Sequence, residues 1–222
     1  NMWMGTYLPD IISFIKSNSI DVCTLQDVTR GAKSKSGNDN FEVLTKELGM
    51  TGEKVETHVL ETDHNTALGN AILFNDSFKI LKHDIIWHHP FHYLSTFERD
   101  RNISDDPRAS ISVLLEKDGV EFYVISTHLA WGITPEDEDF KIKQATVLYD
   151  YIKDLKAPFV LAGDFNVSPH TKVVQLLSSL GRNLCIEKNI TNTLNPETHY
   201  FKSAFPPGIS CDNVIVHPSF KV

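Results

Sequence analysis

The period of the hydrophobic pattern changes along the chain, which predicts helices and strands in alternation. Residues 8–18 carry apolar side chains at helical spacing, and the next segment, 20–25, is strand-like. A polar stretch at 31–40, rich in Gly, Ser and Lys, indicates a loop. The segment 41–48 is predicted as a short helix because Gly49, a residue common just beyond helix ends, follows it.

The middle of the chain is predicted to be mostly sheet. Lys117-Asp118-Gly119 marks a hairpin between two strand-like segments. The β-rich segments are separated by turn residues and lie at 71–74, 80–87, 109–115 and 120–126.

The last part of the chain alternates again between helix and strand. Thr134 as the cap and Pro135 at the first position predict a helix that runs to about Lys156. The acidic residues after Pro135 would interact favourably with the positive end of the helix dipole. Helix capping therefore explains the acidic run better than a metal site does. The other predicted elements are a buried strand at 157–162, a helix at 169–180 capped by Ser168, and a strand at 212–216 reached through a turn at 206–208.

Hairpin-linked strands together with helices that cover sheet faces suggest two packed sheets flanked by helices. A single large mixed sheet is the alternative that the pattern leaves open. The chain has 222 residues, 41% of them hydrophobic, which is enough to bury a substantial core as one domain. Its net charge of -8 disfavours nonspecific binding to duplex DNA, because such binding comes from clustered Lys and Arg.

The cysteines argue against both a disulfide framework and a thiolate metal site. The chain has three, Cys23, Cys185 and Cys211, far apart and without CxxC spacing. We expect reduced thiols, which slightly favour the cytoplasm, although the sequence does not fix a location. No apolar stretch approaches the length of a membrane span, and no signal peptide is seen. The first residue is Asn1 rather than Met, so we expect that preceding residues are missing.

The tetrapeptide Gly163-Asp164-Phe165-Asn166 is the most informative candidate for chemistry. It follows a predicted buried strand, where open α/β sheets place their active sites. Side chains at i and i+2 of an extended segment point the same way, so Asp164 and Asn166 can face one phosphate together. Taken alone, the tetrapeptide fits an ordinary turn equally well.

Six segments occur in a fixed order: Asn1, 25–27 (LQD), 69–73 (GNAIL), 126–129 (STHL), 163–166 (GDFN) and 211–215 (CDNVI). Together with Arg108 and Gln144, they resemble the endonuclease/exonuclease/phosphatase superfamily, which includes deoxyribonuclease-I-like nucleases and inositol-polyphosphate 5-phosphatases. The resemblance implies an α/β fold, a four-layer αββα sandwich of two packed mixed β-sheets flanked by helices. It also implies cleavage of phosphoester bonds with Mg²⁺ or Mn²⁺.

The resemblance assigns Asp27 as the principal metal ligand, at a position where the family usually has Glu. Asn1 matches the family's N-terminal Asn, which lies beside that carboxylate and helps hold the metal and its waters. Asp is one methylene shorter than Glu, so the cation would sit deeper or bind more weakly through water.

The remaining site residues follow from the same resemblance. Asp164 would orient or deprotonate the attacking water, and Asn166 would hydrogen-bond the scissile phosphate. His128 would donate a hydrogen bond to a phosphate oxygen as charge builds in the transition state. Asn70 and Arg108 are expected to bind substrate or organise the site.

Asp212 matches the carboxylate that, in the family, holds the catalytic histidine of a final Ser-Asp-His motif. No Ser-Asp-His occurs in the sequence, which stops at Val222. Either the chain is incomplete at its C-terminus or the protein lacks this acid–base partner. We favour incompleteness, and therefore expect one domain over residues 1–222 that is truncated at both ends.

Two functions stay open. The first is a metal-dependent phosphoesterase that cleaves a phosphodiester or phosphomonoester by in-line attack of an activated water. The second is a catalytically impaired binding module with the same fold, motivated by Asp27 and the missing Ser-Asp-His. Independently of that choice, each of these residues has a purely structural alternative: Asp27 as a surface turn acid, His128 as a sheet histidine and Asp212 as an acid at a strand start. The substrate (nucleic acid, phosphoinositide or another phosphoester) is unassigned, the acidic charge favours a smaller one than duplex DNA, and we expect a monomer.

The segment 87–93 (WHHPFHY) also invites a metal interpretation. His88 and His92 are four residues apart, but Pro90 between them disfavours the helix that would put both on one face. We predict a loop in which the rings pack together, with stacking on a base or sugar as the alternative.

Overall fold

The computed structural model describes residues 1–97, 102–194 and 209–222. Its helices are α1 (Leu8–Ser17), α2 (Asn40–Leu48), α3 (Asp139–Lys153), α4 (Lys172–Ser178) and α5 (Leu184–Glu187), with 3-10 turns η1 (Trp3–Gly5), η2 (Gly31–Lys33) and η3 (Ile103–Asp105). Its strands are β1 (Val22–Arg30), β2 (Thr51–Leu60), β3 (Asp63–Phe74), β4 (Lys79–His89), β5 (Arg108–Lys117), β6 (Val120–His128), β7 (Phe159–Asp164), β8 (Arg182–Asn183) and β9 (Asp212–Val216).

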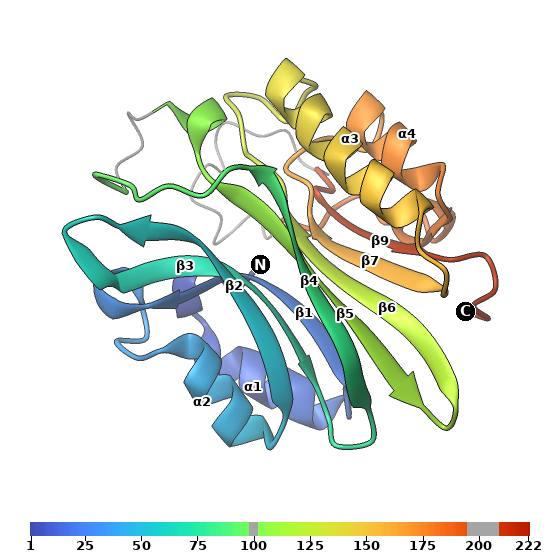
Figure 1. Cartoon of the computed structure of the whole chain (residues 1–222), viewed down its shortest axis with the longest axis horizontal. Coiled ribbons are helices and arrows are strands. Elements are labelled where there is room, and N and C mark those ends of the chain that lie inside the picture. The colour runs from blue at the N-terminus through green and yellow to red at the C-terminus, as the bar shows by residue number, and fades with distance from the viewer. Residues whose placement is uncertain (98–101, 195–208) are drawn as a thin grey trace.

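Two β-sheets pack against each other, and each carries helices on its outer face (Figure 1). The first sheet has the order β1-β3-β2 and is covered by α1 and α2. The second has the order β4-β5-β6-β7-β9-β8 and is covered by α3 and α4. The αββα sandwich is therefore confirmed. The second sheet is mixed, with a parallel β6–β7 pair, whereas the first is antiparallel rather than mixed.

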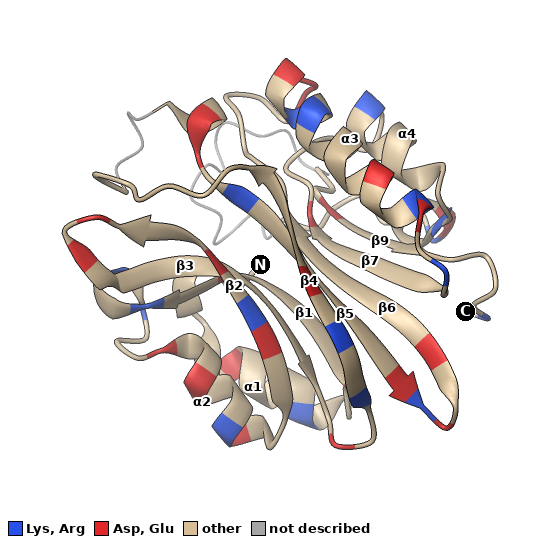
Figure 2. Ribbon diagram, viewed as in Figure 1, with Lys and Arg blue, Asp and Glu red and all other residues tan. Residues whose placement is uncertain are grey.

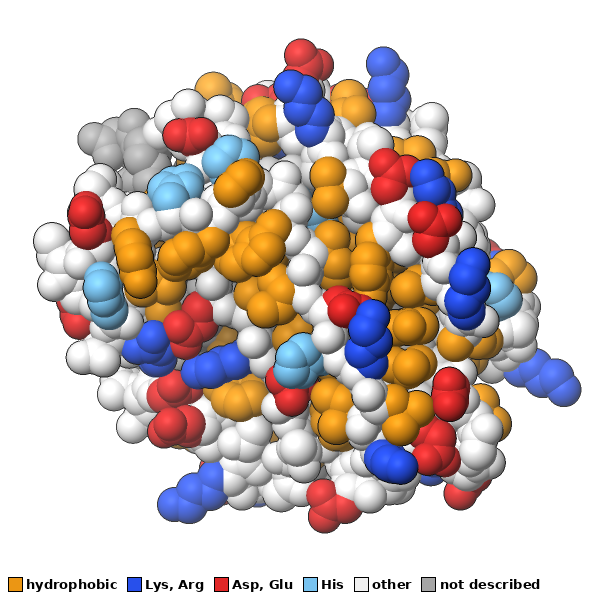
Figure 3. Space-filling view, in the orientation of Figure 1, with side chains coloured by type: hydrophobic (Ala, Val, Ile, Leu, Met, Phe, Trp, Pro, Cys, Tyr) orange, Lys and Arg blue, Asp and Glu red, His pale blue; other side chains and the backbone are white. Residues whose placement is uncertain are grey.

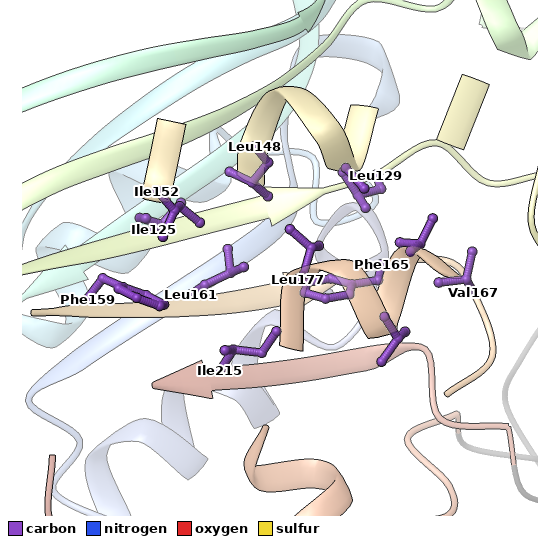
Figure 4. Close-up of a cluster of buried hydrophobic side chains, with 13 residues drawn as sticks. Ile125, Leu129, Leu148, Ile152, Phe159, Leu161, Phe165, Val167, Leu177 and Ile215 are labelled. Carbon is purple, nitrogen blue, oxygen red and sulfur yellow. The ribbon is translucent and has the colours of Figure 1, made fainter. Parts of the chain in front are cut away.

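Buried hydrophobic clusters fill the spaces between these layers. Leu44 and Leu73 belong to the cluster between the first sheet and its helices, and Ile111 lies in the cluster between the sheets. Leu148 and Leu161 belong to the cluster under α3 and α4, whose side chains interdigitate in Figure 4. Fully burying one such side chain contributes about 1.5–3 kcal/mol, so these interfaces fix the relative positions of the strands.

The strand register of the second sheet sets three of the predicted site residues side by side. His128 at the end of β6 pairs with Asp164 at the end of β7. Asp164 pairs in turn with Asp212 at the start of β9. Gly163 permits this approach, because a Cβ there would overlap the carbonyl oxygen of Thr127 on β6.

Several local predictions are confirmed. α1 begins at Leu8, and β9 spans Asp212–Val216 as expected. α2 ends at Gly49, which has the left-handed conformation (φ 61°) that favours glycine. The β5–β6 hairpin turns through Asp118 and Gly119, both with positive φ. The turn expected at 206–208 lies outside the described residues.

The predicted start of α3 was wrong. The helix begins at Asp139, and residues 134–138 form a loop. The carboxylate of Asp137 accepts hydrogen bonds from the backbone of Lys172 and Val173 at the start of α4. The acidic run thus does stabilise a helix N-terminus, but that of the neighbouring helix rather than its own.

The start of α4 was also predicted too early. Thr171 is its N-cap, with Oγ1 3.5 Å from the amide nitrogen of Val174, where Ser168 was expected. Ser168 instead donates its amide hydrogen to the carbonyl oxygen of Pro135, a partner distant in sequence. The tertiary contact of Ser168 with Pro135 therefore outweighs its local preference to cap a helix.

The extent of the sheets was underestimated. β2 was not predicted, because charged residues on both of its faces, such as Glu53 on one and Lys54 on the other, interrupt the apolar alternation. β3 begins at Asp63 rather than near Ala71, and β1 continues past Leu25 through an irregularity in its pairing with β3. β4 includes His88 and His89, which were expected in a loop, and the short elements β8 and α5 had no clear sequence pattern.

Within the described ranges, no helix is long and apolar enough to cross a membrane.

Candidate functional site

A β-bulge in β1 places Asp27 at the end of the sandwich. The β1–β3 register shifts between Leu25 and Val28, and Asp27 has a positive φ of 55°. A bulge re-aims one side chain out of the strand alternation, and Asp tolerates the left-handed conformation better than most residues. The preceding residue, Gln26, is buried and donates from Nε2 to Ser126 Oγ on the opposite sheet at 3.0 Å. This hydrogen bond fixes the bulge between the sheets.

His128 lies between two predicted carboxylates. Its Nδ1 is 3.3 Å from Asp27 Oδ1, and its Nε2 is 3.7 Å from Asp164 Oδ2. The side chains of His128 and Asp164 are each 10% exposed and that of Asp27 is 20% exposed. The three groups therefore form one cluster, drawn from both sheets, that is largely shielded from solvent and still open to it on one side.

Asp164 and Asn166 are brought together by a turn rather than by an extended segment. Asn166 has φ 54°, and its amide nitrogen donates to Asp164 Oδ1 at 2.9 Å. Asn166 Nδ2 donates to the carbonyl oxygen of Leu129 at 2.8 Å, directly after His128. The expectation that both side chains point the same way from an extended strand was wrong, because an Asx turn intervenes. The turn nevertheless keeps Asn166 beside the cluster.

Asn1 reaches the same cluster from the start of the chain. Its Nδ2 donates to Asp164 Oδ2 at 3.1 Å, and its Oδ1 accepts from the amide nitrogen of Trp3 at 2.8 Å. Its backbone nitrogen donates to Gln26 Oε1 at 3.1 Å. Gln26 thus connects Asn1, the bulge and β6, although the sequence pattern had given this residue no role.

The charge of Asp27 is stabilised by its surroundings. Burial acts to raise the pKa of Asp27, but the charge of the His128 imidazole, its hydrogen bond and the charge of Arg108 outweigh that effect and hold the pKa well below its usual range. Asp27 is therefore a carboxylate at neutral pH, available to a cation or to an imidazolium.

Asp212 is in the opposite situation. Burial and the charge of Asp164 raise the pKa of Asp212 to about 6. Its backbone amide donates to Thr193 Oγ1 at 3.1 Å, and the amide of Cys211 donates to the same oxygen. Thr193, which no sequence motif pointed to, therefore anchors the start of β9 beside the cluster.

Asn70 and Arg108, which were expected to bind substrate or organise the site, are both buried. Asn70 is buried and donates from Nδ2 to the carbonyl oxygen of Ala109 at 2.8 Å, which links the two sheets. Arg108 is 4% exposed and close enough to Asp27 to lower its pKa. Gln144 on α3 accepts a hydrogen bond at Oε1 from the amide of Ala130, so it supports the segment that follows His128.

The residues that could hold a metal ion are oxygen donors. Asp27 and Asp164 supply carboxylates, and Asn1 and Asn166 supply amide oxygens. In the part of the chain that the structure describes, no group of three or more His, Cys, Asp and Glu side chains forms a ready-made metal site. The donor set is the kind that Mg²⁺ uses, since this ion takes one or two protein carboxylates and keeps several waters.

The aromatic segment packs largely on itself. Tyr93 stacks on His64 with ring centroids 4.5 Å apart, and Phe91 contacts both Tyr93 and Trp87 edge to face. Phe91 and Tyr93 remain 41% and 48% exposed. Figure 3 shows hydrophobic side chains and histidines gathered on this face. Packing among the rings is thus confirmed for these residues, and stacking on a base or sugar stays a prediction.

All described cysteines are free thiols, as expected: Cys23 and Cys185 are partly buried and Cys211 is buried. Burial raises the pKa of Cys23 to about 11, so this thiol stays protonated at neutral pH. The Cys23 thiol is therefore not a thiolate nucleophile or ligand at neutral pH.

Known structures resemble this fold over nearly its whole length. A functionally unknown conserved protein from Enterococcus faecalis V583 has a TM-score of 0.67 and 17% identity, with 98% of this chain and 81% of that chain covered. A mannosyl-6-phosphatase from Bacteroides thetaiotaomicron has a TM-score of 0.66 and 15% identity, covering 97% and 78%. The human Nocturnin catalytic domain with bound sulfate has a TM-score of 0.64 and 20% identity, covering 96% and 74%.

A search of curated proteins gives no match to this sequence. At the identities above, the structural likeness shows the fold alone. The sequence itself matches the endonuclease/exonuclease/phosphatase family over residues 1–222, and the observed sandwich agrees with that match. The chain therefore belongs to the endonuclease/exonuclease/phosphatase family.

Proposed function

We propose that this protein is a phosphoesterase that uses a divalent cation, Mg²⁺ or Mn²⁺, to hydrolyse a phosphodiester or phosphomonoester by in-line attack of water. Membership of the family supports a hydrolase that acts on phosphoesters. The observation that carries the proposal is the convergence of two carboxylates from different sheets on one imidazole. Asp27 Oδ1 lies 3.3 Å from His128 Nδ1, and Asp164 Oδ2 lies 3.7 Å from His128 Nε2.

The donor atoms fit a hard cation. Asp27, ionised and 20% exposed, is suited to be the protein carboxylate of such a site, with Asn1 beside Asp164 to position water. When bound, the cation would neutralise charge on the phosphate oxygens and leaving group. The shorter Asp side chain at position 27 is offset in part by the bulge, which moves its backbone out of the strand alternation.

The side chains of the cluster would take the remaining catalytic roles, which are orienting the water and stabilising the transition state. Asp164 would accept a hydrogen bond from the attacking water and aim it at phosphorus, because its Oδ1 is already fixed by the amide of Asn166. His128 would donate a hydrogen bond to a phosphate oxygen as negative charge develops. Arg108 would keep the surroundings of Asp27 positive. The limited exposure of the cluster strengthens each of these interactions.

The substrate class is supported by two features. The similar Bacteroides protein is described as a mannosyl-6-phosphatase, and the similar Nocturnin domain binds sulfate, an anion of phosphate-like shape. Lys and Arg are interspersed with Asp and Glu over both sheets rather than forming one basic region (Figure 2). We therefore favour a small phosphorylated molecule over long duplex DNA.

The second candidate function is a binding module with impaired catalysis. It is favoured by the amide groups of Asn70 and Asn166, whose Nδ2 atoms already donate to backbone carbonyl groups. In that case the site would bind a phosphate group through Asp27-associated cations without turning it over.

One experiment separates these functions. We would measure hydrolysis of bis-p-nitrophenyl phosphate and p-nitrophenyl phosphate by the whole protein, extended by any residues that naturally precede or follow it, with Mg²⁺, Mn²⁺ or EDTA. We expect metal-dependent turnover that EDTA abolishes. Asp164→Ala should lower kcat by at least about 100-fold, because general base and positioning roles contribute 10²–10⁴-fold.

The matched control is Asp150→Ala, an exposed carboxylate on α3 that pairs with Lys153. This variant should keep wild-type turnover, and circular dichroism should show that both variants are folded. Turnover that survives EDTA, or an Asp164→Ala variant as active as wild type, would contradict the proposal. Phosphate binding without any turnover would favour the binding module.

A further inference from the structure

Lys141 is a charged side chain that is fully buried in the described core. It lies on α3, and its exposed fraction is 0%. Its Nζ donates to the carbonyl oxygens of Thr134 at 2.9 Å and Glu136 at 3.1 Å, and it pairs with Glu138 Oε1 at 3.1 Å. A buried ammonium group is costly unless it is paired and hydrogen-bonded, so all of these partners are needed to keep it there.

The partners of Lys141 belong to one segment, residues 131–138, which we call the β6–α3 loop. This loop is also tied to the segment that follows β7. The carbonyl oxygen of Pro135 accepts from the amide of Ser168 at 2.6 Å, and Asp137 Oδ2 accepts from the amide of Lys172 at 2.8 Å. The Glu136 carboxylate lies 3.0 Å from His170 Nε2.

The two tied segments are those that carry the candidate site. The β6–α3 loop begins two residues after Leu129, and Ser168 is two residues beyond Asn166. At the site itself the segments meet again, because the amide of Leu129 donates to the carbonyl oxygen of Asp164 and Asn166 Nδ2 donates to Leu129. The two segments are thus joined at the candidate site and again at the β6–α3 loop, and Lys141 fixes the loop.

We infer that Lys141 is a positioning residue: its buried ammonium group fixes the β6–α3 loop, and through Ser168 that loop holds the turn that presents Asp164 and Asn166. Its role in turnover rests on the proposed function, whereas its role in holding the turn does not. The carbonyl groups of Thr134 and Glu136 point to Lys141 instead of continuing a helix, which explains why α3 starts only at Asp139.

Gly132 provides a second, independent way to disturb the contacts of Lys141. A Cβ at this position would overlap Glu138 Oε1 and crowd Lys141 Nζ. Gly132→Ala therefore displaces the partners of Lys141 while leaving every charge in place. The close approach also indicates that the loop is packed tightly around the ammonium group rather than covering it loosely.

The first test is amide hydrogen exchange by mass spectrometry, which needs no substrate. We would compare the wild-type protein with Lys141→Met, which keeps the apolar stem, and with Lys141→Arg, which keeps the charge. The matched control is Lys143→Met, on the same helix and exposed. In Lys141→Met we expect at least tenfold faster exchange in peptides containing Ser168 and Lys172, with strand β3 unchanged. Lys141→Arg should recover part of the protection, and Lys143→Met should match wild type.

The second test is steady-state kinetics on the substrate that the wild-type protein hydrolyses. A positioning role predicts a fall in kcat of about tenfold or more with KM changed less than twofold, because misplaced groups lose transition-state contacts first. A merely structural role predicts lower thermal stability with unchanged kcat per folded molecule. If the wild-type protein shows no turnover, the proposed function fails, and hydrogen exchange still decides the role of Lys141.

Unchanged exchange at Ser168 and Lys172 in a folded Lys141→Met protein would overturn the inference. If Lys141→Met does not fold, Gly132→Ala decides instead. Faster exchange of the Ser168 peptide in Gly132→Ala, with β3 still protected, supports the inference, and wild-type exchange there overturns it.

Discussion

His88 is a polar residue that is only partly exposed and is uncharged at neutral pH. It follows Trp87 on β4, and its Nε2 lies 2.7 Å from Ser110 Oγ, which in turn donates to Thr127 Oγ1 at 2.6 Å. Burial, reinforced by the charge of Arg108, lowers the pKa of His88 to about 3. The imidazole is therefore uncharged under ordinary conditions and serves as a hydrogen-bonding group beside Ser110.

This pKa makes stability depend on pH. The unfolded protein takes up a proton on His88 near the ordinary pKa of about 6.5, whereas the folded protein does so only near pH 3. The contribution to stability is thus complete above pH 6.5 and is lost as the pH falls toward 3. Relative to wild type, His88→Gln should lose less unfolding free energy between pH 7 and 5, by about 2 kcal/mol.

Urea unfolding at several pH values would measure this difference. Ile85→Gln is the control, because Ile85 is 45% exposed, lies on the same strand and carries no titrating group. His88→Gln should differ from the wild-type protein in the pH dependence of unfolding, and Ile85→Gln should agree with it. Parallel pH profiles for His88→Gln and wild type would show that His88 titrates normally in the folded protein.

At the scale of elements, the site depends on how closely β6 approaches β7. Gly163 has no side chain to hold these strands apart, and the carbonyl oxygen of Thr127 occupies the space that a Cβ would need. The register that pairs His128 with Asp164 rests on this contact. Close packing of β6 on β7 therefore explains why a glycine occupies the first position of the GDFN tetrapeptide.

Gly163→Ala should force the strands apart or shift their register. We expect a loss of about 1–3 kcal/mol in unfolding free energy, as for other overpacked sites, together with a larger loss of turnover than of stability. Thermal unfolding and the phosphoesterase assay would measure the two effects. Gly119→Ala is the comparison, since no atom lies within 4 Å of a Cβ there and only turn strain is added.

If Gly163→Ala and Gly119→Ala lowered stability equally and left turnover unchanged, close packing of β6 on β7 would not control the site.

At the scale of the whole molecule, polar contacts between the sheets align the two halves of the cluster. Gln26 on β1 donates to Ser126 Oγ on β6, and Ser126 donates to the carbonyl oxygen of Leu25 at 3.2 Å. These groups are buried between the sheets. Because a buried polar group without a partner costs free energy, the pair favours one alignment of the sheets over shifted ones.

Ser126→Ala should lower the unfolding free energy by about 1–3 kcal/mol, because Gln26 Nε2 loses its acceptor. The double variant Gln26→Met/Ser126→Ala should cost less than the sum of the single variants, since it removes both polar groups together. Urea unfolding of all four proteins gives the coupling energy. Strict additivity would mean that the hydrogen bond does not couple the sheets.

Much of the fold followed from local pattern. Helical spacing predicted α1, Gly49 predicted the end of α2, and the Lys117–Gly119 turn predicted the β5–β6 hairpin. These features depend on propensities and turn geometry within a few residues. The edge strand β2 was missed because charged residues on both of its faces interrupt the alternation. The start of α3 was misplaced because the carbonyl groups of Thr134 and Glu136, which would belong to the predicted first turn, bond to Lys141.

The sequence by itself indicated the family through its ordered motifs, and the resemblance to that family predicted the layer architecture and the candidate site residues, whereas hydrophobic periodicity alone left a single large mixed sheet open. The tertiary structure alone decided how those residues meet. The Asp27 bulge, the placement of His128 between two carboxylates and the buried contacts of Lys141 each join segments distant in the chain. Such contacts arise only when packing of the sheets and helices brings those segments together, so no local pattern encodes them.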